Sequence, residues 1–326
     1  MRAFGKFLGR VLLTLLIAIT LAVFFAPSDK ADPSLRFDAA TLPDDLDAYL
    51  AAQESAFDDI VPGTQKQIHW AGAAGARTSL SVIYLHGFSA SAQEIRPVPD
   101  QVAKAFGANL FFMRLTGHGR TGAAMASATA NDWLLDLGEA LAIGRRLGER
   151  VLVISTSTGG TLAALMAVQP DLAQDVAGSV FVSPNFGFGA LPETALSLPL
   201  VRYWGPWIFG AERSFPPAND LEATYWTTRY PTVATIPMAS VVRAARAQDY
   251  TQAVIPALFI YSSEDQVVLP ARTDAVVAAW GDAVRVFQPE LGEGDDPHRH
   301  LITGDVMSPN QTAGSVALIV EWAKGL

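Results

Sequence analysis

The chain has 326 residues, of which half are apolar and 17% are charged, and its formal net charge is −9 at pH 7. This length suffices for one large buried core with an insertion, and the acidic balance provides no basic phosphate-binding face, so we expect no nucleic-acid partner. Cysteine is absent, which excludes a disulfide framework, a thiolate metal site and a cysteine nucleophile. No cofactor-binding motif stands out, and we expect neither a cofactor nor a metal.

The N-terminal residues 1–27 have the pattern of a signal anchor or a signal peptide. Arg2, Lys6 and Arg10 precede the uninterrupted apolar run VLLTLLIAITLAVFFA, residues 11–26. A helix of this length is roughly 24 Å long, slightly short of the ~30 Å hydrocarbon core of a bilayer. A cut after Ala26 would lack the small residue that a cleavage site needs, so we favour an uncleaved anchor, with a cleaved signal as the alternative. The positive-inside rule then places the rest of the chain outside the cytoplasm, facing the periplasm in a bacterium, and cleavage would make it a secreted or periplasmic protein.

Residues 28–76 are acidic and only loosely periodic, so we interpret them as a linker and N-terminal extension that contains a short amphipathic helix within residues 42–57.

From residue 77 to the C-terminus, apolar runs alternate with segments of helical period. This alternation predicts an α/β fold with a mostly parallel central sheet, and runs that are apolar throughout predict helices on both faces. The expected strands lie within residues 79–87, 108–119, 150–155, 176–184, 255–265 and 283–291.

The turn STSTG, residues 155–159, follows a predicted strand and continues directly into a predicted helix. It matches the nucleophile elbow G-x-S-x-G, with Ser155 in place of the first glycine. A strained elbow needs small residues two positions before and after the nucleophile, and Ser157 satisfies this, whereas Ser155 would have a valine before it. We therefore predict Ser157 as the nucleophile and the backbone N–H of Thr158, at the start of the helix, as an oxyanion donor. The alternative is a helix cap made of small residues.

Residues 184–253 interrupt the alternation and are rich in proline, glycine and large aromatic residues. We predict that they form a lid inserted over the active site. Their aromatic side chains would line an apolar pocket for an acyl or aromatic group, or else form the core of the lid or a membrane-facing surface. These aromatic residues are Phe186, Phe188, Tyr203, Trp204, Trp207, Phe209, Tyr225 and Trp226.

Together with three flanking motifs, the elbow resembles the α/β-hydrolase superfamily, in particular its branch of monoacylglycerol lipases, carboxylesterases and related serine aminopeptidases. The motifs are LHGF at residues 85–88, LTGHG at residues 115–119 and YSSEDQVV at residues 261–268. The resemblance covers roughly residues 78–324, with the lid unassigned, and departs at Ser155 and Ser262, where the family usually has glycine. It implies that the backbone N–H of Phe88 is the other oxyanion donor.

The resemblance also implies where the base and the acid lie. The base of this fold follows the last strand, which leaves His298 and His300 of the five histidines, and HLITGD at residues 300–305 resembles the run that follows the base. His300 is thus the predicted base and His298 the alternative. Asp265 occupies the position of the acid at a strand end, with the neighbouring Glu264 as the alternative.

The remaining histidines and one pair of acids are given structural roles. We expect His86 and His118 to hold loops by hydrogen bonds and His69 to be an ordinary strand residue. Asp295 and Asp296 are adjacent and lack spaced partners, a pattern typical of a solvated loop rather than of a metal site.

The resemblance implies a serine hydrolase that cleaves small-molecule carboxylic esters, including lipid-like esters, through an acyl-enzyme. The triad would be Ser157, Asp265 and His300, whose order along the chain is the one expected for this fold. Two alternatives stay open, namely a serine peptidase or amidase on the same triad and a non-catalytic binding protein of the same fold.

Overall fold

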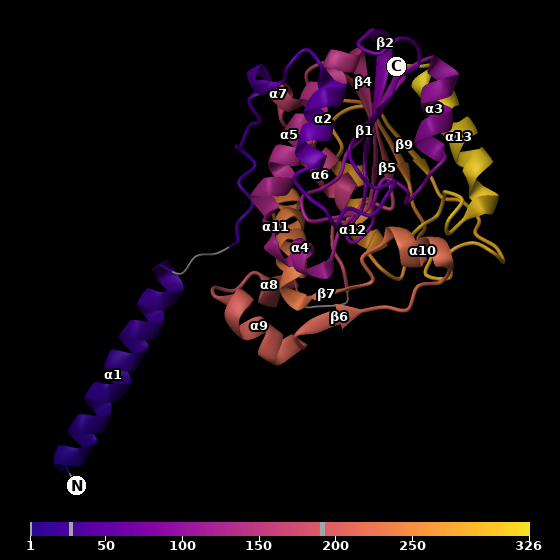
Figure 1. Cartoon of the computed structure of the whole chain (residues 1–326). Coiled ribbons are helices and arrows are strands. Elements are labelled where there is room, and N and C mark those ends of the chain that lie inside the picture. Colours follow the sequence, from indigo (N-terminus) through magenta and orange to yellow (C-terminus); the bar gives the residue numbers. More distant parts are fainter. Residues whose placement is uncertain (1, 26–28, 190–192) are drawn as a thin grey trace.

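A computed structural model describes residues 2–25, 29–189 and 193–326 (Figure 1). Helix α1 (Arg2–Phe25) projects from the body formed by the rest of the chain, and its described side chains are exposed. Residues Ala3–Leu21 within it have a mean hydropathy of 1.8 and are long and apolar enough to cross a membrane. The predicted N-terminal apolar helix is therefore present as a candidate membrane-spanning or signal helix.

The body is built on a seven-stranded sheet with the order β1-β3-β2-β4-β5-β8-β9. Strand β1 pairs antiparallel with β3, and the other neighbouring pairs are parallel. This arrangement confirms the predicted α/β-hydrolase fold class with a mostly parallel sheet. The strands are β1 Gln67–His69, β2 Thr78–Leu85, β3 Asn109–Phe112, β4 Gly148–Thr156, β5 Val176–Val182, β8 Ala257–Ile260 and β9 Val284–Phe287.

Helices cover both faces of the sheet, which Figure 1 shows nearly edge-on between them. Helices α5, α6 and α11 contribute to one hydrophobic core, and α13 packs with α3 over the other. Because both faces are covered, every residue of β5 is buried, as its continuous apolar sequence predicts. A capping box between Thr129 and Asp132 begins α5. The main helices are α3 Val98–Phe106, α5 Ala130–Leu147, α6 Thr158–Ala167, α11 Thr235–Arg246, α12 Pro270–Ala279 and α13 Pro309–Ala323.

The segment that we interpreted as a linker and extension packs along the body. Helix α2 (Leu46–Glu54), which follows the short 3₁₀ helix η1 (Ala39–Thr41), buries leucine side chains in the core to which α5 also contributes. At its C-terminal end, the Glu54 carboxylate accepts two hydrogen bonds of 2.8 Å from the buried Arg114 guanidinium. Strand β1 then adds an edge to the sheet, and His69 is a strand residue as predicted.

Between β5 and β8 the strand–helix alternation fails, as predicted, and small elements take its place. Strands β6 and β7 form a separate antiparallel pair. Helix α11 differs from its neighbours because its buried face packs against α5 and α6 as part of the main core. The other elements of the segment are α8 Glu193–Leu196, α9 Val201–Phe209, β6 Glu212–Ser214, α10 Asp220–Tyr225, β7 Arg229–Pro231, η2 Thr232–Ala234 and η3 Tyr250–Gln252, while α4 Gly122–Ser127 and α7 Pro170–Ala173 lie earlier in the chain.

Candidate active site

The turn between β4 and α6 holds Ser157 in a strained backbone conformation. Its φ is 49° and its ψ is −114°, a region that residues with a side chain rarely occupy. The turn is tight because β2 passes directly beside it: a Cβ on Gly159 would lie 2.0 Å from the carbonyl oxygen of Leu85. Only glycine fits at position 159, which explains why the sequence has one there.

Ser155 and Ser157 have different surroundings. Ser155 is fully buried, and its hydroxyl donates a hydrogen bond of 2.9 Å to the carbonyl oxygen of Val180 on β5. The small residue at position 155 thus fits against the neighbouring strand, and its hydroxyl is engaged there. Ser157 lies at the end of the strand, at the N-terminus of α6.

His300 and Asp265 form a buried pair. The Nδ1 atom of His300 lies 2.7 Å from Oδ2 of Asp265, and both residues are buried. The other carboxylate oxygen of Asp265 accepts backbone N–H bonds from Val267 and Val268 at 2.8 and 2.9 Å. With Nδ1 directed at the carboxylate, Nε2 is the ring nitrogen that remains available for proton transfer.

The two alternatives to this pair lie at the surface. His298 is exposed, and the bonds it makes within the described ranges are through its backbone. The Glu264 side chain is exposed and lies 3.8 Å from the Arg299 guanidinium. The structure therefore pairs His300 with Asp265, whereas the alternatives, His298 and Glu264, lie at the surface.

Asp296 positions the histidine loop, contrary to its interpretation as part of a solvated loop. Asp295 and Asp296 are both buried. The carboxylate of Asp296 accepts three backbone N–H bonds, from His298, His300 and Leu301, at 2.7 to 3.0 Å. A buried carboxylate needs such donors, and here they fix the backbone that carries His300.

The pKa of His300 is raised above its ordinary value. Burial of the imidazole lowers it, but the Asp265 carboxylate raises it through its charge and its hydrogen bond. The carboxylates of Glu94 and Asp296 raise it further. The imidazolium form of His300 is thus favoured by the charges around it.

A family model described as "Alpha/beta hydrolase family" matches residues 82–305, a range that contains the elbow and the buried histidine–aspartate pair. The chain belongs to the alpha/beta hydrolase family. The predicted superfamily is confirmed.

Known relatives of this alpha/beta hydrolase include lipolytic enzymes. The chain is 28% identical over 206 residues to the thermostable monoacylglycerol lipase of Bacillus sp. (strain H-257), covering 60% of this chain and 75% of that protein. Among solved structures, one from the metagenome-derived lipolytic enzymes LipS and LipT superposes with a TM-score of 0.66 and 21% identity, covering 82% of this chain and 100% of that chain. A soluble variant of the monoglyceride lipase of Saccharomyces cerevisiae superposes with a TM-score of 0.56 and 11% identity, covering 80% of this chain and 91% of that chain. At these identities the solved structures support the fold.

The loop after β2 of this alpha/beta hydrolase lies beside the elbow. A Cβ on Gly87 would lie 3.1 Å from Cβ of Ser157 and 2.6 Å from Oε1 of Glu94, so the three residues are in close contact. Among the described residues, the backbone N–H groups of Phe88 and Thr158 have no acceptor. Both are free to donate to a ligand.

Glu94 is a residue of this site that the sequence analysis missed. It is buried, and its Oε2 accepts hydrogen bonds from the Gly87 N–H at 2.7 Å and the Tyr84 hydroxyl at 2.8 Å. Burial raises its pKa to about 7, although the Gly87 N–H, Tyr84 and His300 each oppose this rise. In the sequence Glu94 is the first residue of a segment of helical period, but α3 begins at Val98 and Glu94 lies in the turn before it.

The two structural histidines lie beside the same loop. His86 is buried, its Nε2 accepts the Leu115 N–H at 3.0 Å, and its Nδ1 lies 2.8 Å from the carbonyl oxygen of Gly87. The buried His118 ring packs against Trp133 and His86. His86 thus holds a loop by hydrogen bonds, as expected, whereas His118 acts mainly by ring packing.

The aromatic residues predicted to line an acyl pocket do not lie together. Phe186 is buried in the main core, with its ring centroid 5.9 Å from that of Tyr250, and Trp226 is buried in a separate small cluster. Tyr203 and Trp207 are exposed on α9. The segment folds into several small elements, so neighbours in sequence face different surroundings.

Tyr230 is an aromatic residue near the site that the sequence analysis missed. Its ring packs edge-on against that of Phe88, with centroids 5.2 Å apart. The Thr227 N–H donates a hydrogen bond of 2.8 Å to the carbonyl oxygen of Ser89. Both contacts join the segment between β5 and β8 to the loop after β2.

Glu94→Gln is expected to change how stability depends on pH. Because the pKa of Glu94 is raised from 4.5 to about 7, the native state binds its proton more tightly than the unfolded state does. The stability that the protonated group provides is complete below pH 4.5 and is lost as the pH rises through about 7. Glutamine stays neutral, so the unfolding free energy of Glu94→Gln relative to the parent should rise by up to about 3 kcal/mol across this range.

Thermal unfolding of the full chain in detergent, at about pH 5 and about pH 8, measures this change. A constant offset between the two proteins is allowed, because the amide differs from the carboxyl group in its hydrogen bonds. Glu264→Gln, at an exposed position, is the control. The same offset at both pH values would contradict the prediction.

Proposed function

We propose that this alpha/beta hydrolase is a serine esterase of the lipase and carboxylesterase type. The observation that carries the proposal is the buried pair of His300 and Asp265, 2.7 Å apart, in a fold whose nucleophile elbow holds Ser157 with a φ of 49°. A serine hydroxyl needs a base to take its proton and a third group to fix the tautomer of that base. These residues supply the three roles.

In the acylation step, Oγ of Ser157 attacks the ester carbonyl carbon while Nε2 of His300 takes the hydroxyl proton. Asp265 keeps the other ring proton on Nδ1 and stabilises the imidazolium. The tetrahedral intermediate collapses when the alcohol leaves with the proton from Nε2. Water, deprotonated by the same nitrogen, then attacks the acyl-enzyme and releases the acid and Ser157.

The negative charge on the tetrahedral oxygen would be stabilised by the backbone N–H groups of Phe88 and Thr158. The N-terminus of α6 adds the positive end of its dipole. Glu94 accepts a hydrogen bond from the Gly87 N–H and so fixes the backbone just before Phe88. This contact would maintain the direction of the Phe88 N–H. One such donor contributes about 3 kcal/mol to catalysis in serine hydrolases.

Lipid-like esters are the substrate class that we favour. The curated relative with 28% identity is a monoacylglycerol lipase. The segment between β5 and β8 contacts the loop of Phe88 through Tyr230, which supports the prediction that part of it acts as a lid over the site. An apolar ring at this place suits an acyl chain better than a charged group.

We assign α1 as an uncleaved membrane anchor, with the body outside the cytoplasm and facing the periplasm. The three cations at its start favour a cytoplasmic N-terminus. Mass spectrometry of the protein from the membrane fraction tests this assignment, because cleavage would remove about 3 kDa, whereas an anchor leaves the N-terminus intact.

A fluorophosphonate probe applied to the full chain in detergent tests the catalytic proposal. We expect covalent labelling, followed by hydrolysis of monoacylglycerols and of simple acyl esters. Faster cleavage of aminoacyl anilides than of esters would identify a peptidase or amidase instead. A folded protein that takes no label and cleaves no ester would identify a non-catalytic binding protein.

A further inference from the structure

Helix α9 presents a group of large apolar side chains to solvent. Tyr203, Trp207 and Ile208 are 70%, 88% and 69% exposed, and Leu198, just before the helix, is also exposed. We call these four residues the α9 patch. Val201 and Gly205 of the same helix are buried and attach it to the protein. Large apolar side chains gathered at the surface are typical of an interaction surface.

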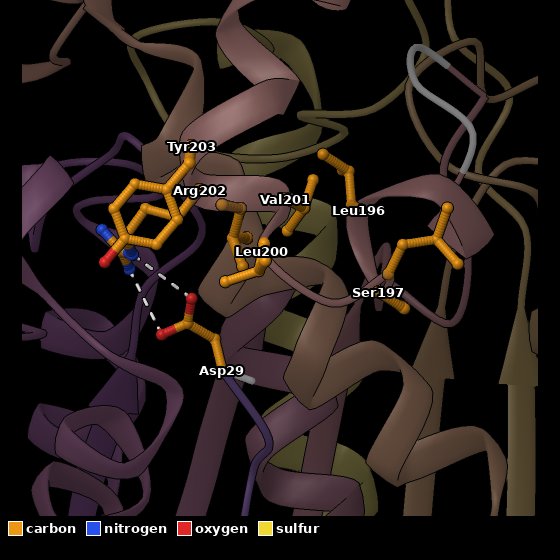
Figure 2. A pocket seen from close by; sticks show the side chains of 9 residues that line it. Asp29, Leu196, Ser197, Leu200, Val201, Arg202 and Tyr203 are labelled. Atoms are coloured by element: carbon orange, nitrogen blue, oxygen red, sulfur yellow. Dashed lines mark hydrogen bonds and ion pairs between the residues drawn. The ribbon is translucent and has the colours of Figure 1, made fainter. Parts of the chain in front are cut away.

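Asp29, the first described residue after α1, forms an ion pair with a residue of α9. Both oxygens of the Asp29 carboxylate lie 3.3 Å from nitrogens of the Arg202 guanidinium, as the dashed lines in Figure 2 show. The hydroxyl of Ser240, on α11, donates to the carbonyl oxygen of Asp29 and accepts the Ala31 N–H at 2.9 Å. The exit of the N-terminal helix is therefore held at two points, one of which is the residue next to Tyr203.

Chain continuity limits how far the α9 patch lies from the end of α1. Helix α1 ends at Phe25, and four peptide steps to Asp29 span at most roughly 14 Å. Helix α9 itself is roughly 13 Å long. The interfacial layer of a bilayer is about 5–7 Å deep on each side. Helix α9 can therefore reach the interfacial layer of a bilayer that α1 crosses.

We propose that the α9 patch docks into the interfacial layer of the same bilayer that α1 crosses. The proposal rests on the assignment of α1 as an uncleaved anchor and does not depend on the esterase chemistry. Tyrosine and tryptophan are the residues that favour this layer, because an apolar ring with a polar edge suits both of its sides. The Asp29–Arg202 pair holds the patch toward the membrane.

This docking would turn the candidate active site toward the membrane. The segment that carries α9 also contacts Phe88, through Tyr230 on β7. A lipid-like ester would therefore leave the bilayer close to the loop of Phe88. The small cavity of about 110 Å³ beside Asp29 is lined by Leu196, Val201 and Ile236, among others, and not by Ser157, Asp265 or His300, so we assign it to the attachment of α9 rather than to substrate.

The absence of cysteine makes the test direct. Ile208→Cys in the full chain keeps both aromatic residues of the α9 patch, and Val284→Cys, at an exposed position on β9, is the matched control. Each variant carries a polarity-sensitive fluorophore and is reconstituted into vesicles of phosphatidylcholine with phosphatidylglycerol. Nitroxide-labelled lipid should quench the label at position 208 roughly twofold or more above the label at position 284, and aqueous iodide should show the reverse order.

Two further variants test the cause. Trp207→Ser in the Ile208→Cys background should reduce quenching by lipid, and Arg202→Gln should reduce it while the protein still floats with the vesicles. If the protein floats with the vesicles but iodide quenches the label at position 208 as strongly as the label at position 284, the docking is overturned and the anchoring is not. A label that is shielded from iodide only at high protein density identifies a second copy as the partner and also overturns it. A parent chain that does not float overturns the anchoring and the docking together.

Discussion

Ser157→Ala is expected to abolish labelling by a fluorophosphonate and to lower kcat/KM for esters by at least about 10³-fold. Without the hydroxyl no acyl-enzyme can form, and only binding and oxyanion stabilisation remain. The measurement is in-gel fluorescence of the labelled full chain beside a steady-state ester assay. The buried position of Ser157 and the tight turn around it make alanine a small change for the fold.

Ser155→Ala is the matched control, because it also removes a serine hydroxyl, but from the residue two positions before Ser157. It deletes the bond to the carbonyl oxygen of Val180, which contributes about 1 kcal/mol to stability. Labelling should persist. Loss of labelling in Ser155→Ala together with its retention in Ser157→Ala would move the nucleophile to Ser155, and retention in both would reject the elbow as the site.

Asp265→Asn is expected to lower kcat by about 10⁴-fold at neutral pH, while substrate binding stays close to that of the parent. The asparagine amide can donate to Nδ1, which places the ring proton on Nε2 and leaves no base directed at Ser157. Steady-state kinetics with a soluble ester separates the loss of kcat from any change in KM. Glu264→Gln, at the exposed neighbour, should keep the activity of the parent.

The same variant should shift the pH profile. The base acts only when it is neutral, so activity falls as the pH drops through the pKa of His300, which the Asp265 carboxylate raises in the parent. Removal of the Asp265 charge lowers this pKa, so the acid limb of the residual activity should move to lower pH. An unchanged acid limb and an unchanged kcat would reject Asp265 as the partner of the base.

Much of the fold could be predicted from the sequence because its signals are local. Apolar runs alternate with helical periods along β2 to β5, and the structure confirms the parallel sheet that this alternation indicates. The elbow is predictable because a tight turn requires Gly159 whatever the rest of the chain does. The failure of the alternation after β5 was also predicted, whereas a lid function for that segment stays a prediction.

The parts that could not be predicted depend on contacts between distant segments. Glu94 has no pattern of its own, and its place in the site follows from its hydrogen bonds with Tyr84 and Gly87. Residues 28–76 look like a linker because they are acidic and only loosely periodic, yet leucine side chains of α2 are part of the core. Asp296 looks solvated because it is adjacent to Asp295 and has no spaced partner, yet three backbone N–H groups donate to its carboxylate.

The sequence by itself determined the fold class, the apolar N-terminal helix and the strained position of Ser157, since periodicity, hydropathy and steric fit are properties of short segments. Only the tertiary structure shows that Asp265 and His300 are paired and buried, whereas Glu264 and His298 are exposed. In each case two candidates lie within two residues of each other, and burial and pairing across 35 residues of chain separate them. The tertiary structure also places Phe186 and Phe188 in the core and Tyr203 and Trp207 in the exposed α9 patch, because these two pairs lie on different segments with different surroundings.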